Sequence, residues 1–210
     1  MCLRFIVFVI LYTFVSFRAL AGDVYVGAGY SLTSHSDSSL EVAIDTKANI
    51  DTDTDGAVIF AGYRFFNGNI ALEVDYQDHG KVKGELTQAG VVIEDKYWIS
   101  FQSYNLSIIG IIPYWHHEAL KGTARFGVGR TKIDDGGTKY QDGNESTAIS
   151  LGFGLEYHFV NRLFLRLNLV GHAAYLDYTY DPGPGSSGAE LSTGYYHTYS
   201  ETSLSIGYLF

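Results

Sequence analysis

Apolar and polar side chains alternate over long stretches of this 210-residue chain. From residue 149 to residue 159, every odd position is Ile, Leu, Phe or Tyr, and every even position is Ser, Gly, Glu or His. Residues 70–77 and 163–169 follow the same period of two. Successive side chains of a β-strand point to opposite faces, so this pattern predicts strands with one apolar face. Along the whole chain it predicts eight strands, at roughly residues 23–31, 56–66, 70–79, 97–112, 120–131, 147–160, 163–179 and 198–210.

The predicted connections alternate in length. Short turns are expected at residues 67–69, 113–119 and 161–162, and longer polar stretches at residues 32–55, 80–96, 132–146 and 181–197. Short turns at one end and long loops at the other are typical of an outer-membrane barrel, in which the short turns are periplasmic. We therefore predict an all-β fold: an eight-stranded antiparallel up-and-down transmembrane β-barrel with short periplasmic turns and four longer external loops.

Side-chain size decides which face of the strands meets lipid. The lumen of an eight-stranded barrel is barely wide enough for its own side chains. The polar face carries many small residues, among them Gly27, Gly29, Gly127, Gly129, Gly152 and Gly154. The apolar face carries bulky Leu, Ile, Phe and Tyr, which would overfill the lumen. This arrangement favours an apolar face toward lipid over a soluble, lipocalin-like barrel.

The N-terminal segment has the features of a secretory signal peptide. Arg4 precedes an apolar run at residues 5–17, and Ala19-Leu20-Ala21 matches a cleavage signal. We predict that residues 1–21 are removed and that residues 22–210 form the barrel domain. The mature chain would then lack the single Cys2, and its 12 basic and 23 acidic residues would give a net charge of −11. An acidic chain of this kind argues against a nucleic-acid partner, because phosphate binding depends on Lys and Arg.

The C-terminal strand carries a candidate assembly signal. Its apolar face consists of Leu204, Ile206, Tyr208 and the terminal Phe210. An open edge this apolar would promote aggregation, which favours closure of the sheet. We expect these four residues to be recognised by the outer-membrane assembly machinery.

Three segments resemble the OmpA-like transmembrane domain family: residues 62–76, residues 154–167 with their intervening turn, and residues 203–210. The resemblance covers essentially all of the expected mature chain and implies insertion in the bacterial outer membrane. Larger members continue into a peptidoglycan-binding domain, whereas this chain ends at Phe210, so we do not expect cell-wall tethering. The family's lumenal gate uses a basic residue where this chain has Asn105 and Ser107, so a gate of that type is not expected.

Charged residues on the inward face are the first candidate site. They are Arg64, Glu73, Asp75, Lys121, Arg125, Glu156 and Arg166. Charges removed from water persist only when paired and hydrogen-bonded, so we expect a network of salt bridges that closes the lumen. The alternative interpretation is a narrow ion path.

Two further clusters could bind a metal. Asp51, Asp53 and Asp55 alternate before Gly56, like the opening of a calcium loop, but Gly62 stands where the bidentate Glu is required. We therefore expect a solvated acidic loop. A zinc site is one interpretation of the sequence at residues 116–118, and an interfacial turn beside Tyr114 and Trp115 is the favoured one.

One cluster suggests catalysis. His197, Ser200 and Glu201 could make a nucleophilic site, as in outer-membrane lipid A deacylases. On a strand, however, His197 and Ser200 would face opposite sides, so we expect a polar strand start instead.

The favoured function is a non-enzymatic surface barrel that displays its loops for adhesion and supports outer-membrane integrity. A lipid A-modifying enzyme and a narrow ion-conducting pore are the alternatives. We expect no cofactor, a monomeric state, and contacts with outer-membrane lipid and lipopolysaccharide, the assembly machinery, and host or surface ligands through the loops. Loops generally carry such functions.

Overall fold

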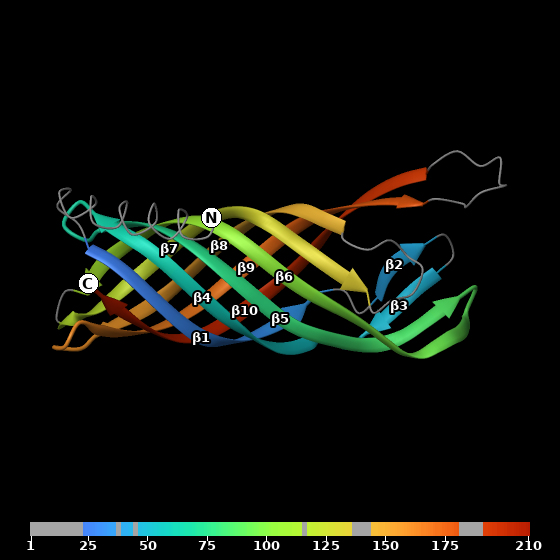
Figure 1. The fold of residues 1–210 in the computed structure, drawn as a ribbon, viewed down its shortest axis with the longest axis horizontal. Helices are drawn as coiled ribbons and strands as arrows, with labels where there is room; N and C mark the ends of the chain where they lie inside the picture. The colour runs from blue at the N-terminus through green and yellow to red at the C-terminus, as the bar shows by residue number, and fades with distance from the viewer. Residues whose placement is uncertain (1–22, 37–38, 44–45, 115–116, 136–143, 181–190) are drawn as a thin grey trace, which may run out of the picture.

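A computed structural model of the chain describes residues 23–36, 39–43, 46–114, 117–135, 144–180 and 191–210. The signal peptide predicted for residues 1–21 lies outside these ranges. The described part is a single sheet rolled into a barrel (Figure 1). Its eight barrel strands are β1 (Asp23–His35), β4 (Asp53–Phe65), β5 (Ile70–Gln88), β6 (Val91–Tyr114), β7 (His117–Asp135), β8 (Asn144–His158), β9 (Leu163–Tyr180) and β10 (Leu191–Leu209).

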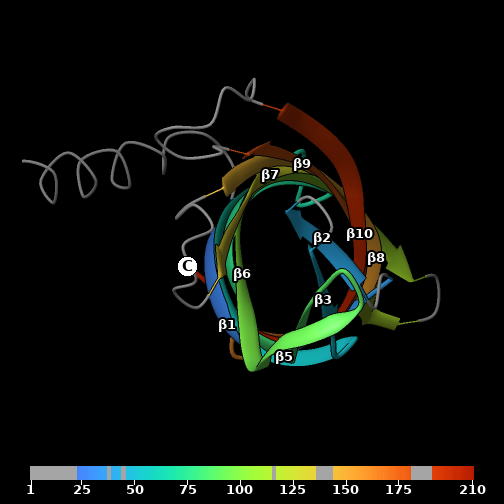
Figure 2. The same cartoon turned by 90° about the vertical axis from the view of Figure 1, so that its right-hand side faces the viewer.

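The barrel closes because every wall strand pairs with two antiparallel neighbours. β1 pairs with β4 on one side and with β10 on the other, and the ladder between β5 and β6 completes the ring. The view along the barrel axis shows this ring end-on (Figure 2). Closure satisfies the backbone N–H and C=O groups within the wall, which is the condition for crossing a bilayer with strands. The predicted eight-stranded antiparallel barrel is confirmed.

The strands run further than predicted at the end that carries the long loops. Residues 80–96, predicted as a loop, continue the β5–β6 ladder as far as Gln88 and Val91. Ala89 and Gly90 make the turn with φ of 49° and 82°. Residues 32–55 likewise contain two short strands, β2 (Ser39–Ala43) and β3 (Thr46–Ile50), and β3 pairs with β5. These extensions have no sustained apolar alternation, so backbone hydrogen bonding rather than burial of one face defines them.

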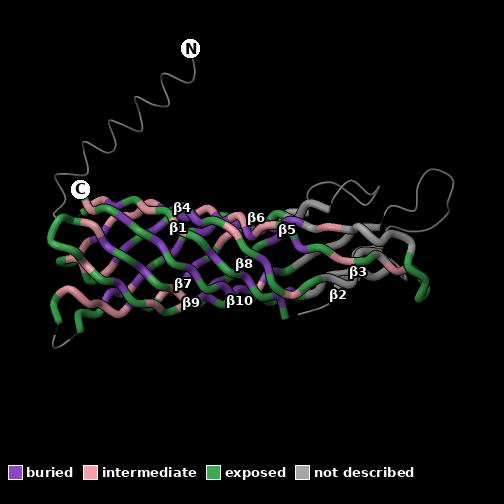
Figure 3. Tube along the Cα trace, turned by 90° about the horizontal axis from the view of Figure 1, so that it is seen from below, coloured by how far each residue is buried: buried purple, intermediate pink, exposed green. Residues whose placement is uncertain are grey.

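The barrel wall exposes apolar side chains on its outer face and buries charged side chains in its lumen, which is the opposite of a globular protein in water. Outward-pointing side chains such as Leu151, Phe153 and Ile108 are 62%, 65% and 55% exposed, whereas charged side chains such as Glu156 and Arg166 are at most 1% exposed. Buried and exposed residues alternate along the barrel strands wherever their burial is described (Figure 3). A bilayer supplies the apolar surroundings that the outward face requires. In the described residues no helix is long and apolar enough to span a membrane.

The small residues predicted for the lumen make room for aromatic rings. A Cβ at Gly27 would lie 2.1 Å from the Phe60 ring, and one at Gly207 would lie 2.2 Å from the Phe164 ring. Phe60 and Phe164 are 6% and 0% exposed and pack with Tyr25 in the half of the lumen nearer the short turns. The inward position of the glycines, inferred from the lumen's limited width, is therefore confirmed.

Candidate functional site

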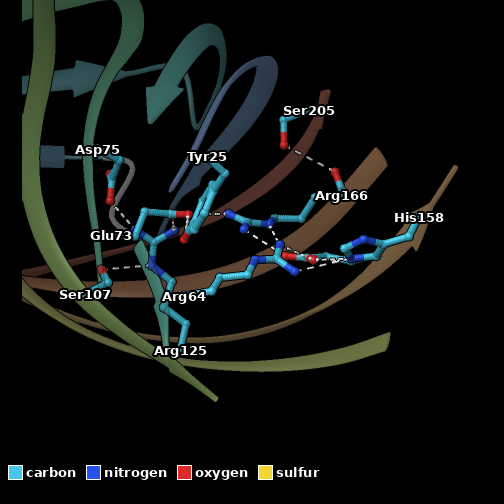
Figure 4. A network of polar contacts seen from close by, with 10 residues as sticks. Tyr25, Arg64, Glu73, Asp75, Ser107, Arg125, His158, Arg166 and Ser205 are labelled. Atoms are coloured by element: carbon cyan, nitrogen blue, oxygen red, sulfur yellow. Dashed lines mark hydrogen bonds and ion pairs between the residues drawn. The ribbon is translucent and has the colours of Figure 1, made fainter. Parts of the chain in front are cut away.

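The lumen holds the candidate site, and its inner half contains a network of paired charges (Figure 4). Six side chains from five strands form the network: Arg64 from β4, Glu73 and Asp75 from β5, Arg125 from β7, Glu156 from β8 and Arg166 from β9. All six occupy inward positions of their strands, as the alternation predicts. Antiparallel pairing brings together residues as far apart in sequence as Glu73 and Arg166.

Arg166 lies at the centre of this network. Its guanidinium is 2.5 Å from Glu73 Oε2 and 2.7 Å from Glu156 Oε1, and its Nε donates to Glu156 Oε1 at 2.8 Å. Arg64 approaches the other oxygen of Glu156 at 2.7 Å. The Tyr25 hydroxyl donates to Glu73 Oε2 at 2.8 Å. Each glutamate is therefore held by an arginine and at least one further partner, as a buried carboxylate requires.

A second group of contacts surrounds Asp75. Arg125 pairs with Asp75 and lies 3.4 Å from Glu73 Oε1. Asn105 donates to Asp75 Oδ1 at 2.9 Å, and Ser107 accepts from Arg125 Nε at 3.0 Å. Asn105 and Ser107 therefore point into the lumen, where Asn105 hydrogen-bonds the acid and Ser107 the base of this pair.

The charges of the network balance, since three arginines face three carboxylates. Two of the arginines also contact the packed rings of Tyr25, Phe60 and Phe164, which we call the aromatic layer. The Arg166 guanidinium lies 4.7 Å from the Phe60 centroid and 5.3 Å from the Phe164 centroid, and Arg64 lies 5.0 Å from that of Tyr25. Delocalised guanidinium groups suit such ring faces and bidentate pairing. The arrangement can close the lumen without leaving a net buried charge.

Lys121 occupies a different position from the other predicted members. It lies opposite Glu156 in the β7–β8 register but is only half-buried, near the short-turn end. His158, which was not predicted as a member, takes part instead. Its Nε2 lies 2.9 Å from Glu156 Oε2.

The outer half of the lumen contains a histidine cluster that the sequence analysis missed. We define it as His35, His79, His172 and His197, all 4% exposed or less, from β1, β5, β9 and β10. His35 Nδ1 lies 3.0 Å from His197 Nε2, and His79 Nδ1 lies 3.0 Å from Thr33 Oγ1. Strand parity could have found two of them, because positions 79 and 172 lie in predicted strands and share the inward face with Glu73 and Arg166. His35 and His197 fall in segments predicted as loops.

Tyr199 lies between the members of the histidine cluster. Its ring stacks on His172 with a centroid distance of 4.6 Å and contacts His79 at 5.1 Å. Glu201, 1% exposed, lies 3.6 Å from His172 Nε2. This half of the lumen is therefore filled by aromatic and imidazole rings, with fewer formal charges than the inner half.

The other predicted clusters are not assembled into sites. Ser200 is exposed on the outer face, while His197 and Glu201 are buried in the lumen, so the three do not converge. Asp53 and Asp55 are exposed on the outward face of β4, and Asp51 is exposed before it. His117 and Glu118 are exposed, and His116 lies outside the described residues. Among the described residues, no group of three or more His, Cys, Asp or Glu side chains could hold a metal ion.

The candidate assembly signal lies on one continuous outward face. Leu204, Ile206, Tyr208 and Phe210 are all exposed, and the rings of Tyr208 and Phe210 meet edge to face at 5.1 Å. The backbone N–H of Phe210 donates to Val24 C=O at 2.9 Å, which places the last residue against the first strand. Recognition by the assembly machinery stays a prediction.

A closed barrel with an apolar outer face and a polar lumen defines an outer-membrane protein. The OmpA-like transmembrane domain matches residues 19–193, and the chain belongs to that family. Comparison with curated proteins gives no match.

Solved structures with a similar fold come from several outer-membrane proteins. AlkL in lipid bilayers is 20% identical, with 91% of each chain covered and a TM-score of 0.58. A major outer membrane protein from Thermus thermophilus is 13% identical, with 90% of this chain and all of that chain covered and a TM-score of 0.55. Ail from Yersinia pestis, solved with the heparin analogue sucrose octasulfate, is 14% identical, with 90% and 99% covered and a TM-score of 0.51. These likenesses support the fold.

Proposed function

We propose that this protein is a non-enzymatic surface barrel whose external loops contact host or surface molecules and whose wall supports outer-membrane integrity. The observation that carries the proposal is the length of the strands at the long-loop end. A transmembrane β-strand needs about 9–11 residues, whereas β5 has 19 and β6 has 24. The surplus extends beyond the apolar band as an ordered hairpin, and the β2–β3 hairpin pairs with it.

The filled lumen supports a surface role over transport. The paired charges and the rings of Tyr25, Phe60 and Phe164 occupy the inner half, and the histidine cluster occupies the outer half. An eight-stranded barrel has little further room. We propose that it acts as a monomer, because each of the eight barrel strands finds both of its neighbours within the same chain.

The test is cell binding by the protein and by loop-trimmed variants. The protein is expressed in the outer membrane of a host that lacks it, and binding to a panel of extracellular-matrix and serum proteins is measured. One variant replaces residues 37–50 with a short turn and keeps the His35 N–H to Thr52 C=O bond of 2.7 Å. A second replaces residues 85–96 with Asn-Gly and keeps the pairing of Gly84 with Tyr97. Heat-modifiable gel mobility verifies that each variant is folded.

We expect binding by the intact protein and its loss in at least one trimmed variant. A version with residues 37–50 in scrambled order has the same composition and serves as the control for non-specific charge effects. Absence of binding by a correctly assembled barrel would refute the adhesion proposal. The alternatives would then be tested by the mass of lipid A in the presence and absence of the protein, and by planar-bilayer conductance.

A further inference from the structure

The seam between β1 and β10 ends at the histidine cluster. The last pair of its ladder is His35 with Tyr199. Beyond this pair, Ser36 donates its backbone N–H to Thr198 C=O at 3.1 Å and its hydroxyl to the same oxygen at 2.7 Å. The chain leaves the seam here and continues to β2 and β3. Contacts at this point therefore hold the base of the first external segment against the wall.

Inside the lumen, two histidines join the same two strands. His35 Nδ1 lies 3.0 Å from His197 Nε2, and both side chains are at most 3% exposed. The two rings stack at a centroid distance of 5.3 Å, and the Phe101 ring lies 4.8 Å from one and 5.7 Å from the other. A hydrogen bond between two ring nitrogens needs one donor and one acceptor. It is lost when both rings are cationic, because two N–H groups then face each other.

Few charges face this pair among the described residues. The titratable groups that act on His35 are His197 and His79. In the same half of the lumen, Glu201 lies 3.6 Å from His172, which stacks on Tyr199, so this carboxylate compensates His172 first. The inward residues of β4, β6, β7 and β8 at this level carry no charge: Thr54, Phe101, Thr131 and Ser146. The charged residues next to them on β4 and β7 face outward: Asp53, Arg130 and Lys132.

The pair lies outside the apolar band. The rings of Tyr76 and Tyr104, 5.0 Å apart, are typical of the membrane–water interface, and Phe101 is three residues further out along β6. Burial and the neighbouring imidazoles lower the pKa of His35 from 6.5 to about 3. The closed seam therefore binds fewer protons than an open, hydrated seam within this pH range, so acid favours opening. Each histidine freed by opening raises the ratio of open to closed seam about tenfold per pH unit.

We infer that His35 and His197 form a pH-sensitive latch, which closes the outer end of the β1–β10 seam near neutral pH and opens it in acid. Two histidines change the ratio of open to closed seam about a hundredfold per pH unit. A seam that is open in about one molecule per thousand near neutral pH would be half open near about pH 5. Opening frees the base of the segment that leads to β2 and β3 and admits water to the outer lumen. This regulation goes beyond adhesion, and its test involves no loop ligand.

Spin labels across the seam test the latch. Ser34 of β1 pairs with Ser200 of β10, and both side chains face outward. Nitroxides on S34C/S200C, in the full chain with Cys2→Ser and in phosphatidylcholine vesicles, give dipolar broadening of the electron paramagnetic resonance spectrum while the seam is closed. The pair A28C/I206C lies on the same seam within the apolar band and reports whether the rest of the seam stays closed. Spectra are recorded between about pH 7.5 and about pH 4.5, across the usual histidine range.

The variant H35Q/H197Q removes both titrating rings, and His117→Gln, at an exposed position near the short turns, is the matched control. We expect the wild type and His117→Gln to lose the S34C/S200C broadening with a midpoint near about pH 5, while A28C/I206C keeps its broadening. H35Q/H197Q should stay closed at the acid end of the range or open at least about one pH unit lower.

If H35Q/H197Q fails to fold or is already open near neutral pH, His35→Gln alone decides. This variant should roughly halve the steepness of the transition, from about two protons to about one, and unchanged steepness would contradict the latch. Broadening in the wild type that persists at the acid end, a wild-type midpoint in H35Q/H197Q, or simultaneous loss at A28C/I206C would overturn the inference.

Discussion

Arg166→Ala tests whether the lumenal network stabilises the barrel. The substitution removes a guanidinium that is 1% exposed and that contacts both Glu73 and Glu156. Two buried carboxylates then lose their shared cation, and the aromatic layer loses a cation lying 4.7 Å from the Phe60 centroid. Substituting one member of a buried ion pair is costly chiefly because the other member stays buried without compensation.

The size of the effect follows from the partners that remain. Removing one partner of a buried pair costs about 3–5 kcal/mol. Glu156 keeps Arg64 at 2.7 Å, and Glu73 keeps Arg125 at 3.4 Å. Because each carboxylate retains one arginine, we expect the lower end of this range, a decrease of about 3 kcal/mol in the free energy of unfolding.

Urea unfolding from phospholipid vesicles, followed by heat-modifiable gel mobility, measures this decrease. Arg166→Met preserves much of the side-chain volume without the charge, so it should be nearly as destabilised as Arg166→Ala. Adding Glu73→Gln to Arg166→Ala neutralises one of the two carboxylates that have lost Arg166. This second substitution should recover roughly 1 kcal/mol of the free energy of unfolding. An unfolding free energy in Arg166→Met within about 0.5 kcal/mol of the wild type, together with unchanged single-channel conductance, would refute the ion-network reasoning.

Three further predictions concern the lumen and the two chain ends. Gly27→Val places side-chain atoms where a Cβ alone would be 2.1 Å from the Phe60 ring, so it should lower the unfolding free energy by about 1–3 kcal/mol, and Phe60→Leu should restore part of it. Phe210→Ala should reduce the folded fraction in outer membranes while leaving refolding of the purified barrel in detergent nearly unchanged; equal losses in both would contradict a recognition role. Mass spectrometry of the intact protein from membranes should give a chain that begins at Gly22.

The alternation of apolar and polar residues was sufficient to predict the membrane-spanning part of the fold, because lipid requires an apolar outer face on every spanning strand. The pattern at residues 149–159 is nearly perfect, and every odd position there is exposed in the structure. Beyond the apolar band the constraint disappears, since water can meet both faces of a strand. Residues 80–96 therefore have no apolar face to detect, and their ladder depends on backbone pairing around the turn at Ala89 and Gly90.

Strand parity, the alternation of inward and outward positions along a strand, identified most members of the ion network. It could not identify which of these residues contact one another. The contact between Arg64 and Glu156 joins residues 92 positions apart and depends on the register of the strands between them. Lys121 has the correct parity and lies opposite Glu156, yet it stays half-buried because it is close to the short-turn end. Depth along the barrel axis, which parity does not report, therefore decides which inward charges become buried.

Two lysines of β5 lie on the outer face because of a feature that strand parity would misjudge. Lys81 and Lys83 have the same odd numbering as the inward Glu73 and would be assigned to the lumen. The register shifts between Asp78 and Lys81, where Gly80 adopts a φ of 78°, and Lys81 and Lys83 turn outward while Val82 becomes fully buried. A Cβ at Gly80 would lie 2.1 Å from a backbone oxygen of β4, so both the conformation and the close approach require glycine. One bulged glycine thus places two lysines of β5 on the outer face, outside a lumen whose charges balance.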